Sequence, residues 1–141
     1  MKLICFFVIT CLLGVPHARA NDSNQTPLDK YRSSTESGLG LCSAIFSIQS
    51  KLADDGQPMK DNTAQCITTV KAKAVTNFKA AILTVKKDKA QEALKTYHVA
   101  FISAIEGITP GLDEPRIIYQ QRQQALAGKV TEAWSRFEIE E

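Results

Sequence analysis

The sequence has little that could carry out chemistry. It contains two histidines among 141 residues and four cysteines, too few for a small disulfide scaffold. No Gly-x-Ser-x-Gly turn is present to expose a serine nucleophile. The formal net charge is only +2 and 44% of the residues are apolar, which excludes a wholly disordered chain. At this length we expect a single globular domain, and we do not expect an enzyme.

The first twenty residues predict a secretory signal peptide. Lys2 precedes an apolar run from Leu3 to Val15, and residues 18–20 form an Ala-Arg-Ala cleavage pattern. The alternative is a membrane anchor, but the run falls short of the ~20 residues that span a bilayer, so no transmembrane segment is expected. We therefore expect cleavage after Ala20 and export of the protein. The destination would be the periplasm in a Gram-negative bacterium, and secretion in any other host.

Removal of this leader changes both the charge and the cysteine count. Two basic residues leave with it, so acidic and basic residues become equal in number and no nucleic-acid partner is expected. Two of the four cysteines leave as well. The remaining Cys42 and Cys66 predict one disulfide bond, because an even number of cysteines in an exported chain is typical of oxidised pairs.

Residues 21–37 predict a flexible polar segment ahead of the folded domain. The segment contains Pro27 and several serines and threonines, and it shows no apolar periodicity. Asn21 and Asn24 each begin an Asn-x-Ser/Thr triplet, a glycosylation site only in a eukaryotic host. The folded domain is therefore expected over 38–141.

The spacing of apolar residues over 38–141 predicts an all-α domain, a small four-helix bundle. The first helix is expected over 38–54. Its predicted core stripe is Leu41, Ile45, Ile48 and Leu52, and Cys42 and Phe46 lie on the flank of this stripe.

The second and third helices are predicted to be separate. The second should begin with Asp61 or Asn62 as its N-cap. A one-residue change in the phase of the apolar residues places a break near Lys87, with Asp88 as the next N-cap and Gln91 in capping-box position. One continuous helix across residue 87 is the alternative, because no glycine or proline lies there.

Turn residues set the remaining boundaries. The third helix should stop at Gly107, and in the Pro110-Gly111 turn the glycine should take a positive φ. The fourth helix should start at Asp113 and carry Trp134 in its core stripe.

The disulfide restricts how the first two helices pack. Cys42 lies twelve residues before the predicted end of the first helix, whereas Cys66 lies in the first turn of the second. At ~1.5 Å per residue, Cys42 is ~18 Å from that end. The connecting residues 53–61 must therefore run back beside the first helix, or the two helices must cross steeply.

No catalytic, metal-binding or cofactor-binding group is predicted. His98 is the one histidine left after cleavage, and its helical neighbours offer it no second metal ligand except an unfavourable neutral lysine, Lys95. We expect His98 to have a structural or solvated role. Trp134 is likewise expected to pack in the core rather than to stack on a ligand.

Two polar surfaces are the candidate binding sites. The second predicted helix has a basic side formed by Lys71, Lys79 and Lys86. These lysines suit an anionic partner, or they simply solvate the helix. The fourth predicted helix has an uncharged polar side formed by Gln120, Gln121 and Gln124. Such a side loses less on desolvation than a charged one, so it could meet another protein or a second copy, or remain solvated.

Together these features predict an exported, non-enzymatic helical protein that acts by binding another protein, in an inhibitory, immunity or chaperone-like role. The main alternative is a binder of small molecules or lipids in the core of the bundle. An undetected hydrolase is the third hypothesis.

Overall fold

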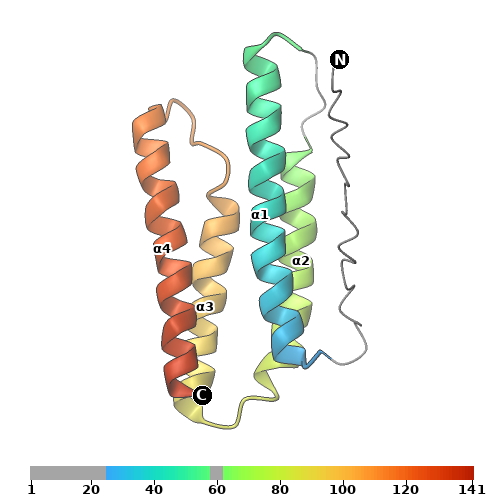
Figure 1. The fold of residues 1–141 in the computed structure, drawn as a ribbon, viewed down its shortest axis with the longest axis vertical. Helices are drawn as coiled ribbons and strands as arrows, with labels where there is room; N and C mark the ends of the chain where they lie inside the picture. The colour runs from blue at the N-terminus through green and yellow to red at the C-terminus, as the bar shows by residue number, and fades with distance from the viewer. Residues whose placement is uncertain (1–24, 58–61) are drawn as a thin grey trace, which may run out of the picture.

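The computed structural model describes residues 25–57 and 62–141, and this part of the chain consists of helices and their connections, without a strand (Figure 1). The four helices are α1 (Pro27–Asp54), α2 (Thr63–Ile82), α3 (Asp88–Glu106) and α4 (Arg116–Glu140). A disulfide joins Cys42 of α1 to Cys66 of α2. The predicted all-α fold, its helix number and its disulfide are confirmed. The expected signal peptide and the two possible glycosylation sites, Asn21 and Asn24, lie outside the described residues.

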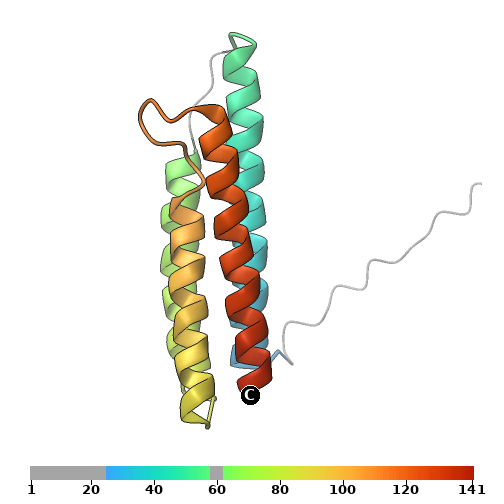
Figure 2. The ribbon, with the colours of Figure 1, turned by 90° about the vertical axis from the view of Figure 1, so that its left-hand side faces the viewer.

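The four helices form two antiparallel hairpins that lie side by side. Figure 1 shows α1 paired with α2 and α3 paired with α4, and in Figure 2 the second pair lies in front of the first. The N-terminal end of α1 and the C-terminal end of α4 lie at the same end of the molecule. Both hairpins contribute to one core, whose largest buried apolar side chains are Tyr31, Leu94, Tyr97, Phe101, Ile105, Ile108, Trp134 and Phe137.

Helix α1 begins at Pro27, so the prediction of a flexible polar segment over 21–37 is wrong for residues 27–37. Thr26 is the N-cap, and its hydroxyl accepts a hydrogen bond from the Asp29 backbone N–H. The Asp29 carboxylate accepts one from the Thr26 backbone N–H, which completes a capping box. Pro27 occupies the first helical position, where its missing N–H removes no helical hydrogen bond. Thr26 and Pro27, which were expected in a flexible segment, therefore start the helix.

The face of α1 that enters the core also differs from the predicted one. Leu41 and Ile48 are each 58% exposed, although the spacing predicts both in the core, and Ile45 and Leu52 are only half-buried. The buried residues of α1 are Tyr31, Thr35, Gly38 and Cys42. Because the disulfide holds Cys42, on the flank of the predicted stripe, against α2, the helix is turned so that the main residues of the stripe lie away from the centre of the core.

The predicted break between the second and third helices is confirmed, since α2 ends at Ile82 and α3 begins at Asp88. The predicted capping box at Asp88 is wrong. Lys87 is the N-cap of α3, and the Gln91 side chain donates to the Val85 carbonyl at 2.8 Å, so Gln91 bonds to the linker instead of to the cap. Asn62 is the N-cap of α2 as expected, but its side chain makes no capping hydrogen bond.

The connection between α3 and α4 is longer than predicted. Helix α3 ends at Glu106 with Gly107 as its C-cap, as expected, but α4 begins at Arg116 and not at Asp113. Asp113 has a φ of 58°, whereas Gly111 does not take a positive φ, so the prediction for this glycine is wrong. Aspartate tolerates the left-handed region better than most residues because its short polar side chain bonds locally.

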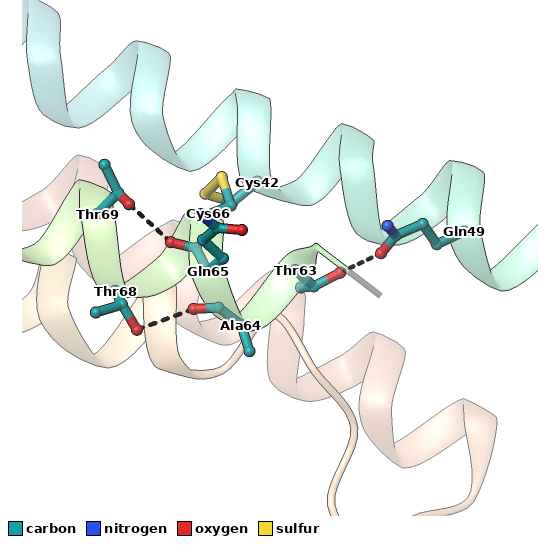
Figure 3. The surroundings of a disulfide bond; sticks show 8 residues. All are labelled: Cys42, Gln49, Thr63, Ala64, Gln65, Cys66, Thr68 and Thr69. Carbon is teal, nitrogen blue, oxygen red and sulfur yellow. Dashed lines mark hydrogen bonds between the residues drawn. A yellow bond between two sulfur atoms is a disulfide. The ribbon is translucent and has the colours of Figure 1, made fainter. Parts of the chain in front are cut away.

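Helices α1 and α2 pack side by side around the disulfide (Figure 3). The Cα atoms of Cys42 and Cys66 are 5.7 Å apart. At the start of α2, the Thr63 hydroxyl donates to Gln49 Oε1 at 2.7 Å. Helix α1 continues past this level to Asp54, for ~8 Å of helix axis. The start of α2 therefore lies beside α1 and not at its C-terminal end, and no steep crossing of the two helices is needed.

Candidate functional site

The three lysines of the predicted basic face have different surroundings. Lys71 pairs with Glu106 of α3, Lys79 is exposed on α2, and Lys86 lies in the linker that follows α2. Because α2 ends at Ile82, the prediction that one helix carries all three is wrong. Lys71 already has a carboxylate partner, so it is a weaker candidate for an external anion.

The glutamines of the predicted polar face are all exposed on α4: Gln120, Gln121 and Gln124. Arg122 and Gln123, which lie between Gln121 and Gln124 in the sequence, bond to the connection from α3 instead. Gln123 Nε2 donates to the Gly107 carbonyl, and the Arg122 guanidinium donates to the carbonyls of Gly107 and Thr109. This part of α4 therefore holds the connection in place and leaves only the outer glutamines for a partner.

Arg122 also pairs with Glu114 inside that connection. Its Nε and Nη2 atoms donate to the two Glu114 carboxylate oxygens at 2.8 and 2.7 Å. Glu114 Oε2 accepts a further hydrogen bond from the Gly111 backbone N–H at 2.8 Å. The bond from Arg122, followed by the backbone bond, lowers the pKa of Glu114 to about 2. These groups satisfy one another, so we assign them a structural role.

His98 lies where α1, α2 and α3 meet. Its Nδ1 is 2.8 Å from the Tyr31 hydroxyl, and its ring stacks on Phe78 with centroids 4.3 Å apart. Burial lowers the pKa of His98 and raises that of Tyr31. Close by, the hydroxyls of Thr35 and Tyr97 are 2.7 Å apart in the buried core. These contacts agree with the structural role expected for His98.

A second polar contact joins the hairpins at Arg32. Its Nη1 atom is 3.1 Å from Glu138 Oε1, and its guanidinium carbon is 4.6 Å from the centre of the Trp134 ring. The Trp134 indole N–H donates to the same Glu138 oxygen. Trp134 is therefore in the core, as predicted, with its N–H paired and one ring face covered by a cation.

A groove of about 590 Å³ lies between α3 and α4 and is lined by these two helices alone. Its apolar lining includes Val99, which is 65% exposed, and the smaller or partly buried Ala100, Leu126 and Ala133. An exposed valine above small residues leaves room for a side chain from outside. The groove is therefore a candidate contact surface.

Charged side chains of mostly positive sign line the same groove. They are Lys95, Lys129, Glu132 and Arg136. Lys95 pairs with Glu92, whereas Lys129 and Arg136 have no carboxylate partner in the described part of the chain. The two unpaired cations are seven residues apart and share one side of α4. The groove thus combines an apolar surface with cations that are free to pair.

A second cavity, of about 560 Å³, lies between the C-terminal half of α1 and the start of α4. The rings of Phe46 and Tyr119 line it with centroids 5.9 Å apart. Its charged lining is balanced, with the cations Lys51 and Arg116 and the carboxylates Asp54 and Glu114. Two aromatic rings beside charges of both signs suit a small amphipathic molecule.

Within residues 25–57 and 62–141, no three or more His, Cys, Asp or Glu side chains are grouped so that they could hold a metal ion. None of the helices described in the chain is long and apolar enough to cross a membrane.

The α3–α4 groove was not predicted from the sequence, although one signal for it is visible there. At helical spacing, Leu94, Tyr97 and Phe101 share one apolar side of the third predicted helix, and Val99 lies on a different side. A large aliphatic residue outside a complete core stripe marks a second contact face. The sequence contains no comparable sign that Lys129 and Arg136 line a groove, because that depends on which helix packs beside α4.

Comparison of the chain with protein-family models, with curated proteins and with solved structures gave no match. The assignment of a function therefore depends on the geometry of the two openings described above.

Proposed function

We propose that this protein is an exported, non-enzymatic protein that binds another protein through the α3–α4 groove. One observation carries the proposal: exposed Val99 lies in the same groove as Lys129 and Arg136, which have no ion-pair partner among the described residues. Apolar surface rimmed by polar groups is typical of a protein contact. The leader predicted for residues 1–20 supports export.

The lining of the groove also indicates the kind of partner. A groove between two antiparallel helices fits a third helix that lays its apolar side into it. Lys129 and Arg136 are two turns apart, ~10.5 Å along the axis of α4. Acidic residues at the same spacing on a partner helix would pair with both cations. The proposed partner is an amphipathic helix with acidic residues beside its apolar side.

Binding of a small amphipathic molecule in the α1–α4 cavity is the second candidate function. The observation in its favour is the pair of rings, Phe46 and Tyr119, in a cavity that also has charged side chains of both signs. Native mass spectrometry of the freshly purified protein would then show a bound molecule that Arg116→Gln loses. Such a molecule, with no protein partner recovered, would favour this function over the first.

Affinity capture from the exported fraction of the host tests the first proposal. The tagged protein should retain a partner that is lost with Val99→Asp and with the double variant Lys129→Glu/Arg136→Glu. Both changes lie at the surface, so the helical circular dichroism spectrum should be unchanged. Salt should weaken the binding, because exposed charges are screened beyond ~8 Å near physiological ionic strength.

Two matched controls make the capture specific. Ile139→Asp places the same charge at an exposed aliphatic residue of α4 that lies outside the groove. Lys79→Glu/Lys86→Glu reverses the same number of charges on the predicted lysine face. Both should leave the partner bound. The proposal would be contradicted if the partner were lost only with Lys79→Glu/Lys86→Glu. It would also be contradicted if every captured partner stayed bound to the groove variants.

A further inference from the structure

Helix α1 presents an uncharged and exposed side to the surroundings. Between Glu36 and Lys51 it has no charged residue, which corresponds to ~21 Å of helix. The exposed residues on one side of this stretch are Ser37, Gly40, Leu41, Ala44, Ser47 and Ile48. We call them the α1 outer face. It lies away from the buried Tyr31, Thr35 and Cys42 that face the core.

Two features make the α1 outer face a contact surface and not merely a solvated one. Leu41 and Ile48 are each 58% exposed, and they lie seven residues apart on the same side of the helix. The small residues Ala44 and Ser47 lie between them on this face, and at Gly40, next to Leu41, an added Cβ would meet no atom within 4 Å. Two aliphatic side chains with small residues beside and between them match the way helices interlock.

We infer that the α1 outer face binds a second copy of this chain, with the two α1 helices packed antiparallel about a two-fold axis. Leu41 and Ile48 are equally far from the midpoint between Ala44 and Ile45. An axis through that midpoint places Leu41 of each copy beside Ile48 of the other. The face is therefore complementary to itself, as a two-fold interface requires.

The charges at the ends of the face agree with this arrangement. Glu36, which also pairs with Arg32 of its own helix, precedes the uncharged stretch, and Lys51 follows it. When the helices are antiparallel, Lys51 of one copy comes within ~3 Å of Glu36 of the other along the helix axis. Parallel helices would instead place like charges together, which costs binding energy. Opposite charges at both ends thus favour the antiparallel pair.

A single helix-to-helix contact buries less surface than a permanent dimer needs, so the dimer should be weak and reversible. The inference is independent of the α3–α4 groove, which belongs to the other hairpin.

Sedimentation equilibrium of the purified protein over a wide micromolar range tests the inference. The wild type should dimerise as its concentration rises. Leu41→Glu and Ile48→Lys should each weaken the dimer at least about tenfold, because each puts an unpaired charge against an aliphatic side chain at both edges of the contact. Ile139→Glu, at an exposed aliphatic residue on α4, should leave the dimer unchanged.

Mixing the two weakened variants tests the antiparallel register. In the mixed pair, the new carboxylate at position 41 meets the new ammonium at position 48, while the opposite edge keeps its wild-type Leu41 and Ile48. The mixture should therefore form heterodimers more readily than either variant forms homodimers. A monomeric wild type, a full-strength dimer in either variant, or no gain on mixing would overturn the inference. A protein partner lost with Leu41→Glu while the wild type stays monomeric would show that another chain covers this face.

Discussion

Among single residues, His98 should give the protein a dependence of stability on pH. Its ring is held between Tyr31 and Phe78, and burial disfavours its charged form, so its pKa in the folded protein lies below the usual 6.5. In the window just below pH 6.5 the unfolded chain binds more protons than the folded one. The free energy of unfolding must therefore fall as the pH falls through that window.

We expect urea unfolding, followed by circular dichroism, to show this loss when the pH is lowered from neutral through 6.5. His98→Gln keeps a hydrogen-bonding side chain near Tyr31 but does not titrate. The variant should therefore lose less stability over the same pH window than the wild type does. If the free energy of unfolding of His98→Gln changes with pH as steeply as that of the wild type, another group causes the effect.

Glu114 provides an internal control for that experiment at lower pH. Its pKa is lowered from 4.5 to about 2, chiefly by Arg122, so its contribution is complete above pH 4.5 and is lost only as the pH falls toward 2. Wild type and His98→Gln should lose this contribution equally. A difference confined to the lower window would point to the carboxylates and away from His98.

The general role of these residues could be predicted from the sequence, but not their partners. Apolar neighbours at helical spacing indicated a structural role for His98 and a core position for Trp134. The Tyr31 hydroxyl that meets His98 is 67 positions away in the sequence, and Arg32 and Trp134 belong to different hairpins. Contacts of this kind depend on how the hairpins pack, and the spacing within one helix contains no information about that.

Among the helices, the approach of α1 to α2 depends on Gly38. An added Cβ at Gly38 would lie 2.5 Å from Val70 Cγ1, and the disulfide at Cys42, one turn further on, restrains the two helices from moving apart. Gly38→Ala should therefore destabilise the protein by about 1–3 kcal/mol, although alanine is the better helix former.

Gly128 in α4 is the matched control, because a Cβ there would meet no atom within 4 Å. Gly128→Ala should be neutral or stabilise the protein by up to ~1 kcal/mol through helix propensity. Urea unfolding should therefore show a lower free energy of unfolding for Gly38→Ala and no loss for Gly128→Ala. Two stabilised variants would show that Val70 moves aside and that Gly38 does not limit the packing.

The start and the buried face of α1 show why the helix pattern was only partly predictive. The Thr26-x-x-Asp29 capping box is visible in the sequence, but Pro27 was read as a break in place of a first helical residue. The true core face contains Thr35 and Gly38, which do not count as apolar. Thr35 is buried because Tyr97 offers it a hydroxyl, and Gly38 is buried because Val70 fills the space above it.

In the whole molecule, each candidate site depends on which helices become neighbours. The α3–α4 groove joins Val99 to Lys129 and Arg136, and the α1–α4 cavity joins Phe46 to Tyr119. Only the apolar and charged character of the separate helices could be read from the sequence. The α1 outer face is the exception, because all of its residues lie in one helix. Only their exposure had to come from the structure.

The two hairpins should unfold as one cooperative unit, although the disulfide lies within only one of them. Tyr31 packs edge-on against Tyr97, with ring centroids 5.8 Å apart, and the hydroxyls of Thr35 and Tyr97 are 2.7 Å apart, so the α1–α2 hairpin shares buried contacts with the α3–α4 hairpin. Reduction of Cys42–Cys66 opens a loop of about 25 residues, which should lower the free energy of unfolding by ~3.5 kcal/mol on the chain-entropy estimate.

Trp134 makes this cooperativity measurable, because it belongs to α4 and reports on the hairpin without the disulfide. Urea unfolding of oxidised and reduced protein should be followed both by Trp134 fluorescence and by far-ultraviolet circular dichroism. If the hairpins share one core, reduction shifts both transitions to lower urea by the same amount, as two-state unfolding requires. A fluorescence midpoint that stays in place while the circular dichroism signal splits would show that the α3–α4 hairpin, with its groove, folds independently of α1 and α2.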